Sequence, residues 1–332
     1  MSRTSSPTRR RRWSRLQRFV VGLLAVAVVA VFAAAGYLWW TERRIERIPS
    51  TDLAALAPLP GGDELTNVLV VGTDDRSTLP EDWDLGYYGR FSGRRADVIM
   101  VAHLVPGERI QLLSIPRDLK VSIPGHGTNR INAAYVVGGP DLLIEVVQAE
   151  LGIPIHHYVE VDFAGVGAIV DALGGVTLEF DTPARDPKSG FRTDGGMVTL
   201  DGEQAVAYAR SRHLEVLVDG EWRSTRGGDI ARTGRQREIL VALFERLASP
   251  KAAIDVATLL PTIADQITAD ERLTLAVMAD LAAQALRLRP DDVEGATLPV
   301  RNTRGGDGRA YVEPTDEAAA VVDAFVAGEP YP

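Results

Sequence analysis

The chain has 332 residues, of which 45% are hydrophobic and 24% are charged. This is the composition of a globular protein, and it excludes a wholly disordered, collagen-like or coiled-coil chain. Because cysteine is absent, disulfide frameworks, thiol nucleophiles and cysteine-based zinc sites are excluded as well. The net charge of −9 is unevenly divided: residues 1–50 hold ten arginines and two glutamates and carry +8, which leaves −17 for residues 51–332. The two parts are therefore expected to face different surroundings.

An uncharged apolar run extends from Phe19 to Trp40. As a helix rising about 1.5 Å per residue it would be about 33 Å long, enough to cross a hydrocarbon core about 30 Å thick. Seven arginines precede the run, and positive charge stays on the cytoplasmic side. We therefore predict a basic cytoplasmic tail over residues 1–18 and a transmembrane signal-anchor over residues 19–40, with the remainder outside the cytoplasmic membrane.

A cleaved signal peptide is the alternative. Its apolar core would usually have about 7–15 residues, followed by a small-residue cleavage site. Here the run is longer and ends in Trp39-Trp40-Thr41-Glu42-Arg43, which favours an uncleaved anchor. The arginine block could also be read as a nucleic-acid-binding arm, but beside a membrane span its role in topology is a sufficient explanation. No nucleic-acid partner is expected, since the outer part is acidic.

Residues 41–62 are predicted to be a stalk, because they end in a stretch rich in proline and glycine. One extracytoplasmic catalytic domain is predicted over residues 63–330, since no obvious linker divides it. Short β-branched runs predict strands at 67–71, 98–104, 110–115, 176–180 and about 295–300. Apolar residues at helical spacing predict helices at 140–151, 163–173, 203–209, 232–247, about 271–288 and about 315–326.

Strands interleaved with helices predict an α/β (α+β) fold. In this fold a central mixed β-sheet is covered by helices on both faces, a three-layer αβα arrangement preceded by one N-terminal transmembrane helix. Gly174-Gly175 is expected to end the preceding helix, where a positive φ is needed. His156-His157 is expected to cap a turn before Tyr158.

Common catalytic signatures are missing from the sequence. It contains no GxxxxGK[ST] phosphate-binding loop and no GxSxG nucleophile elbow. The five histidines lack the HExxH spacing, so a zinc site is not expected.

Aspartates and arginines remain as candidates, at predicted strand ends and loop starts. Arginine forks bind phosphate oxygens in a bidentate manner, and Mg²⁺ is usually held by one or two carboxylates together with substrate phosphates. The set therefore suggests phosphoryl transfer or hydrolysis at a diphosphate, the alternative being surface salt bridges. Its members are Asp74, Arg76, Arg95, Asp97, Arg117, Asp118, Arg210, Arg212, Asp229, Arg232, Arg235 and Gln236.

Eight motifs follow one another between residues 67 and 247. They are NVLVVGTDDR, RADVIMV, SIPRD, RINAAY followed by Gly138-Gly139, YVEVDF, VDALGGV, LDGEQAVAYARSRH, and Asp229-x-x-Arg232-x-x-Arg235-Gln236. In this order they resemble the LytR–CpsA–Psr family. The single anchor with a short basic cytoplasmic end also resembles the layout of that family.

The resemblance implies a membrane-anchored phosphotransferase that acts outside the cytoplasmic membrane. Such an enzyme transfers a glycopolymer from a polyprenyl-diphosphate carrier to peptidoglycan, with Mg²⁺ (or alternatively Mn²⁺) as cofactor. The polymer stays open among arabinogalactan, wall teichoic acid and capsule, and the arginine bias favours an actinobacterial envelope. Two other functions stay open: a polyprenyl-diphosphate hydrolase, and a non-catalytic regulator that binds lipid-linked polymer.

The resemblance also implies roles for individual residues. Asp74 and Asp97 would hold Mg²⁺, and Asp97 would help to deprotonate the attacking sugar hydroxyl. Asp229 is expected to orient Arg232. Catalysis would depend on Asp97, Arg117 and Arg95, and the diphosphate would be bound by Arg95, Arg117, Arg210, Arg212, Arg232 and Gln236.

The lipid chain would need an apolar slot, which residues 142–151 and 163–173 could line unless their side chains are simple core. Two stretches, 77–94 and 214–228, are longer than the usual family connections. Because both flank the predicted site, they are expected to shape acceptor or polymer specificity, or to close as a lid.

Overall fold

The computed structural model describes residues 35–59, 66–74, 95–225, 228–247, 250–285, 287–289 and 292–332, together with Ala33 and Trp83. The chain divides into two compact units, Met1–Arg43 and Arg44–Pro332. The predicted cytoplasmic tail and most of the predicted signal-anchor lie outside the described residues. Within the described ranges, no helix combines the length and the apolar character needed to cross a membrane.

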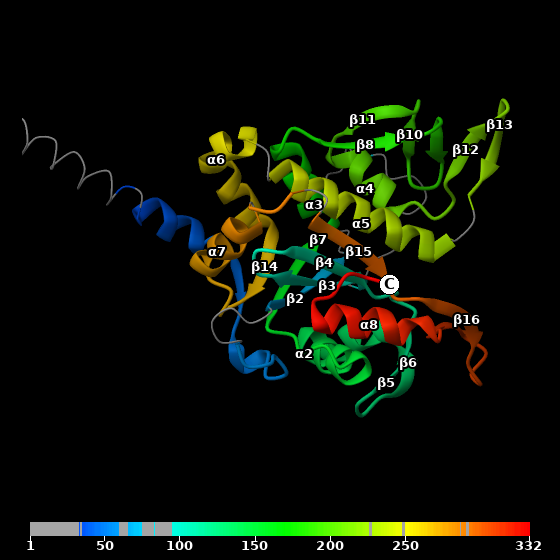
Figure 1. The fold of residues 1–332 in the computed structure, drawn as a ribbon, viewed down its shortest axis with the longest axis horizontal. Coiled ribbons are helices and arrows are strands. Elements are labelled where there is room, and N and C mark those ends of the chain that lie inside the picture. Colours follow the sequence, from blue (N-terminus) through cyan, green and yellow to red (C-terminus); the bar gives the residue numbers. More distant parts are fainter. Residues whose placement is uncertain are drawn as a thin grey trace, which may run out of the picture. The chain divides into compact units, whose positions relative to one another are not determined.

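A mixed sheet forms the centre of the second unit (Figure 1). Its strands are β1 (Glu46–Ile48), β2 (Thr66–Thr73), β3 (Ala96–Val105), β4 (Arg109–Ser114), β7 (His157–Asp162), β14 (Ile267–Asp270) and β15 (Val293–Thr297). They are arranged in the order β1-β14-β7-β2-β3-β4-β15. β2 pairs in parallel with β7 and antiparallel with β3, so the end of β2 meets the start of β3.

Shorter strands form small sheets around this centre. A four-stranded sheet has the order β10-β9-β12-β13, and three further pairs join β5 with β6, β8 with β11, and β16 with β17. The bounds are β5 (Lys120–Ile123), β6 (Gly127–Arg130), β8 (Val176–Phe180), β9 (Ala184–Asp186), β10 (Phe191–Thr193), β11 (Gly196–Leu200), β12 (Glu215–Val218), β13 (Glu221–Ser224), β16 (Val300–Arg304) and β17 (Ala310–Pro314).

Helices cover both faces of the central sheet (Figure 1). They are α2 (Ile131–Leu151), α3 (Phe163–Ala172), α4 (Gly202–Arg210), α5 (Gly228–Leu247), α6 (Pro250–Gln266), α7 (Leu275–Ala285) and α8 (Glu317–Ala327). Side chains alternate between the faces of a strand: Leu69 and Val71 of β2 pack in one core with α2 and α8, whereas Val70 lines a cavity with Phe163 of α3 and Ile239 of α5. The predicted α/β fold with a central mixed sheet is confirmed.

The predicted helix at 140–151 is the second half of α2. Gly139 has φ +67°, so α2 consists of two helices that meet at a kink, and Pro140 follows the kink directly. Proline suits the first position of a helix, where its missing N–H is not needed. This explains why the sequence pattern identified only the second half.

Residues 44–59 differ from the predicted stalk. β1 pairs in parallel with β14 at the edge of the central sheet. Leu53 and Leu56 are buried in the core that includes α2, and Gln148 of α2 donates to the carbonyl of Ala55 at 2.7 Å. Residues 60–65 lie outside the described part of the chain, but the apolar residues before them belong to the folded unit.

The prediction that His156-His157 caps a turn is wrong. Nδ1 of His156 accepts a hydrogen bond from the backbone N–H of Asn67 at 3.0 Å. His157 is the first residue of β7, and its Nδ1 lies 3.1 Å from a carboxylate oxygen of Asp270. Both histidines are buried and join neighbouring strands.

Asp270, at the end of β14, is fully buried and holds this edge of the sheet together. Its carboxylate accepts the backbone N–H groups of Tyr158, Arg272 and Leu273 at 2.9, 2.9 and 3.0 Å. Burial alone would raise the pKa of Asp270, but the hydrogen bonds from His157 and from these N–H groups bring the pKa below its ordinary value.

We expect Asp270→Asn to lower the free energy of unfolding by about 3 kcal/mol at pH 7, because an amide cannot accept all of these donors. The folded-state pKa lies below the unfolded value of about 3.9, so the contribution of Asp270 is present above about pH 4 and is lost as pH falls through the folded-state value. Urea unfolding at pH 7 and pH 3 should therefore show a smaller acid loss in the variant. An equal acid loss in both proteins would contradict this account.

Candidate active site

Both predicted metal-binding carboxylates lie at one edge of the central sheet, where β2 ends and β3 begins. Asp74 follows β2 directly and Asp97 is the second residue of β3; each is only 8% exposed. The backbone N–H of Asp74 donates to the carbonyl of Arg95 at 3.1 Å. The strands come close here because Gly72 has no side chain: a Cβ would lie 2.7 Å from Val98.

Two guanidinium groups hold Asp97. Nη1 of Arg117, which follows β4, donates to Asp97 at 2.5 Å, and Nη1 of Arg232, on α5, lies 3.9 Å from its other oxygen. Burial alone would raise the pKa of the Asp97 carboxyl, but the charges of Arg232, Arg117 and Arg212 hold the pKa below its ordinary value. Asp97 is therefore ionised at neutral pH, and an acceptor with so low a pKa is a weak general base.

Arg210, the last residue of α4, faces the other carboxylate. Its Nη2 lies 4.0 Å from Asp74, and its guanidinium carbon lies 5.5 Å from the centre of the Phe163 ring. The ends of β4 and α4 and the first turns of α5 thus bring arginines to the two aspartates. Among the described residues, four arginines (Arg117, Arg210, Arg212 and Arg232) act on Asp74 and Asp97, and Asp118 lies 3.9 Å from Arg117 as a third carboxylate, so positive charge is in excess.

The remaining predicted site residues are placed differently. The side chain of Arg95 is exposed at the start of β3, so only its backbone takes part in the contacts described above. Gln236 lies one turn after Arg232 on α5 and is 4% exposed. The side chain of Asp229, expected to orient Arg232, and all of Arg76 lie outside the described part of the chain.

Gln236 lines a narrow apolar cavity of about 40 Å³ between the sheet and helices α3 and α5. Neither atom of its side-chain amide has a hydrogen-bond partner among the described residues. A buried amide left unpaired costs about 1–3 kcal/mol, and such groups are commonly completed by a ligand or a water. The other lining residues are Val70, Gly72, Val98, Val161, Phe163, Val166, Ala209, Ile239 and Leu240.

The two segments predicted to line an apolar slot lie on opposite faces of the central sheet. Phe163 and Val166, from the predicted segment 163–173, line this cavity. Leu143 and Val147, from 142–151, instead lie in the core that α2 forms with the central sheet. Val71 belongs to that core and Val70 to the cavity, so the sheet separates the two segments.

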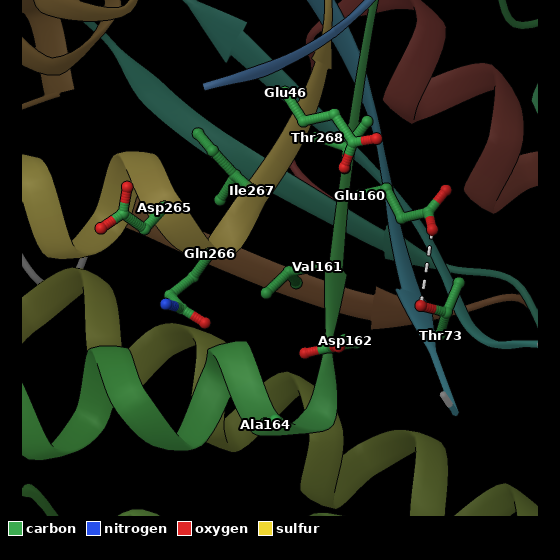
Figure 2. Close-up of a pocket in the computed structure, with 10 residues that line it drawn as sticks. All are labelled: Glu46, Thr73, Glu160, Val161, Asp162, Ala164, Asp265, Gln266, Ile267 and Thr268. Carbon is green, nitrogen blue, oxygen red and sulfur yellow. Dashed lines mark hydrogen bonds between the residues drawn. The ribbon is translucent and has the colours of Figure 1, made fainter. Parts of the chain in front are cut away.

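A larger cavity of about 350 Å³ is lined by residues of β1, β2, β7 and β14, of the end of α6 and of the start of α3 (Figure 2). Its polar lining is mainly acidic. Glu160, one of these acids, is buried and accepts the hydroxyl groups of Tyr135 at 2.9 Å and Tyr158 at 2.7 Å. A phosphate would be repelled here, so the arginine-rich side of Asp74 is the better place for an anion. The lining residues are Glu46, Thr73, Glu160, Val161, Asp162, Ala164, Asp265, Gln266, Ile267 and Thr268.

The two long stretches flanking the site differ in what the structure describes. Of residues 77–94, only Trp83 is described; it packs with Phe163 and Val206, and a Cβ on Gly167 would lie 2.2 Å from its ring. The second stretch contains the hairpin β12–β13, and its Trp222 ring stacks on Arg185 of β9, whose guanidinium carbon lies 4.1 Å from the ring centre. Their influence on specificity stays a prediction.

Known relatives agree with this fold. The model of the LytR_cpsA_psr family matches residues 47–324. The chain belongs to this family. Its fold is similar to that of the LytR-Csp2A-Psr enzyme from Actinomyces oris, with a TM-score of 0.65 and 26% identity over 85% of this chain and 96% of that one.

Two relatives are similar in sequence. The chain is 35% identical to the probable cell wall biosynthesis protein LcpB of Corynebacterium glutamicum, over 75% of this chain and 56% of that protein. It is 31% identical to the polyisoprenyl-teichoic acid–peptidoglycan teichoic acid transferase TagU of Oceanobacillus iheyensis, over 62% of this chain and 59% of that protein. The matches therefore span less than two thirds of the length of these two relatives.

We expect Gln236→Met to raise the free energy of unfolding by about 1 kcal/mol, because it removes a buried amide without partners at similar volume. Gln148→Met is the matched control, since the Gln148 amide donates to Ala55 and accepts from the N–H of Ile155 at 2.9 Å. That variant should lose stability. Thermal unfolding of both variants checks the pair, and destabilisation by Gln236→Met would contradict the account.

Proposed function

We propose that the chain is a membrane-anchored, Mg²⁺-dependent phosphotransferase that transfers a glycopolymer from a polyprenyl-diphosphate carrier to peptidoglycan. One observation carries the proposal: four arginines, two of them buried, act on two buried aspartates, and Gln236 beside them lines an apolar cavity. A polyprenyl diphosphate has the same two parts, an anionic head and an apolar chain. The names of LcpB and TagU support the cell-wall context.

The arginines suit the charge of the donor. A guanidinium group stays protonated when buried and binds phosphate oxygens in a bidentate manner. Arg117 and Arg232 are oriented by Asp97, and Arg210 lies beside Asp74. The two phosphates of the donor would neutralise the arginine charge that Asp74 and Asp97 do not balance.

In the proposed reaction, a sugar hydroxyl of peptidoglycan attacks the phosphorus that carries the glycopolymer. The bond from this phosphorus to the bridging oxygen breaks, and polyprenyl phosphate leaves with the bridging oxygen. The hydroxyl proton passes to bulk water, and a phosphodiester joins polymer and peptidoglycan. Phosphoryl transfer depends mainly on positioning and charge neutralisation, which the fixed arginines provide. Asp97 would keep two of them in place rather than accept the proton.

Mg²⁺ fits the two aspartates. No group of three or more histidines or acidic residues that could hold a metal occurs in the described ranges, so a cage made by the protein alone is not the expected form. Asp74 and Asp97, on adjacent strand ends, provide the one or two carboxylates that Mg²⁺ usually takes beside substrate phosphates. When bound there, the ion would neutralise charge on the diphosphate.

The proposed location is the cytoplasmic membrane, with a single pass, the N-terminus inside and the catalytic unit outside. The support is the uncharged run over residues 19–40 and the arginines before it. A lipid-linked donor stays in the membrane, so anchoring the enzyme there raises the effective concentration of the donor.

Lysine in place of Arg117 or Arg210 should lower the kcat/KM of transfer about 100-fold, because lysine cannot form the bidentate fork. The assay uses the full chain in detergent with a short lipid-diphosphate oligosaccharide, peptidoglycan fragments, and either Mg²⁺ or a chelator. Arg309→Lys is the control, since Arg309 is exposed and pairs at the surface with Asp307. Wild-type rates in both site variants would contradict the proposal. Sugar phosphate released without attachment would indicate a hydrolase, and lipid binding without turnover a regulator.

The pH dependence tests whether Asp97 stays ionised in the working range. Because its pKa lies below the ordinary value, Asp97 is expected to stay ionised from about pH 5 to 8. Asp97→Asn should then lower the transfer rate by the same factor throughout this range. A factor that changes with an inflection between pH 5 and 8 would contradict the lowered pKa of Asp97.

A further inference from the structure

Asp186, the last residue of β9, is a fully buried carboxylate. One of its oxygens accepts three hydrogen bonds, from Oγ of Ser211 at 2.7 Å and from the backbone N–H groups of Arg212 at 3.0 Å and His213 at 2.9 Å. The other oxygen accepts the N–H of Lys188 at 2.9 Å. Four donors from two separate segments therefore meet on one side chain.

The segment that Asp186 holds lies between two arginines of the site. Arg210 ends α4, and Ser211 turns the chain into an extended conformation, with φ −60° and ψ 130°. The carbonyl of Ser211 accepts a hydrogen bond from Arg235 of α5. Ser211 is thus held from one side by β9 and from the other by α5, and the chain directions of Arg210 and Arg212 are fixed with it.

The charge of Asp186 contributes to this hold. Burial alone would raise the pKa of its carboxyl, but the hydrogen bonds from Ser211 and from the backbone of His213, Lys188 and Arg212 bring the pKa below its ordinary value. The group is therefore ionised at neutral pH. Hydrogen bonds to an ionised acceptor are about twice as strong as neutral ones, so this contact keeps the segment in one conformation.

We propose that Asp186 is a positioning residue, which sets the spacing of Arg210 and Arg212 for the two phosphates of the donor. The inference rests on the proposed function, since it takes the arginines as the groups that bind the diphosphate. If Asp186 has this role, the small sheet β10-β9-β12-β13 helps to position the arginines of the site. The sheet supplies the carboxylate through β9 and continues from the same segment into β12.

A purely structural carboxylate of the same kind is available for comparison. Asp270 is equally buried and also accepts two consecutive backbone N–H groups. Its carboxylate accepts the N–H of Tyr158, near the start of β7. Asp162, the last residue of β7, is instead paired with Thr73, next to Asp74 of the site. The two positions are four residue-to-residue steps apart along β7, about 13 Å at about 3.3 Å per step.

The test measures the dissociation constant of farnesyl diphosphate in Mg²⁺ by calorimetry, with the full chain in detergent and the folded fraction determined for each variant. Asp186→Asn should weaken binding at least about tenfold, the size expected for lost hydrogen bonds to a charged acceptor. Asp270→Asn should lose stability but bind as the wild type does. Equal affinity of Asp186→Asn and the wild type would overturn the inference.

A milder pair keeps the test decisive if Asp186→Asn does not fold. Ser211→Ala removes one of the four donors and leaves three backbone N–H groups, so it should weaken binding about threefold. Ser189→Ala is its control, because Oγ of Ser189 donates to the carbonyl of Asp186 and not to its carboxylate. If Ser211→Ala and Ser189→Ala bind alike, the inference is wrong.

A double-mutant cycle separates positioning from general stability. If Asp186 acts through Arg212, Asp186→Asn should weaken binding much less in an Arg212→Ala background than in the wild type, since neighbouring groups of one network are not additive. Full additivity would show that Asp186 does not act through Arg212. Failure of the wild type to bind any diphosphate would instead remove the proposed function, and the inference with it.

Discussion

The ion pairs between Asp97 and the arginines around it are the interaction on which the rest of the site depends. A buried guanidinium group cannot lose its proton, so it needs a counter-charge. Asp97 provides one for Arg117 and Arg232, and Asp74 faces Arg210. Because the arginines outnumber the aspartates, the folded protein keeps an excess of positive charge in a largely buried place. An anion with two phosphates would complete this arrangement, and the apolar cavity beside Gln236 would receive the chain attached to them.

The scaffold holds these charges through elements that are far apart in the sequence. The antiparallel pairing of β2 and β3 brings Asp74 next to the start of β3, and Asp186 and Arg235 fix the segment after α4. The apolar cavity, in contrast, is narrow. Its volume of about 40 Å³ is far below the several hundred Å³ of a typical ligand pocket, so a polyprenyl chain would have to part α3 and α5 from the sheet as it enters.

The sequence allowed much of the fold and part of the site to be predicted, because the motifs end or begin strands and strand ends meet at one edge. Asp97 and Arg117 were predicted in this way, and Arg232 from its place at the start of a helix; the structure brings the three side chains together. Contacts between distant segments left no such signal: β1 pairs with β14 across more than 200 residues, and Asp186 lies in a stretch without a motif. The weak basicity of Asp97 was also hidden, since its pKa depends on arginines from other elements.

The most direct test of the central claim is a crystal structure of the chain with farnesyl diphosphate and Mg²⁺. The account predicts both phosphates against Arg117, Arg210 and Arg232, with Mg²⁺ between them and the aspartates. It also predicts the farnesyl chain between the sheet and helices α3 and α5, beside Gln236. Phosphates bound away from these arginines, or a chain in the acidic cavity at Glu160, would contradict it.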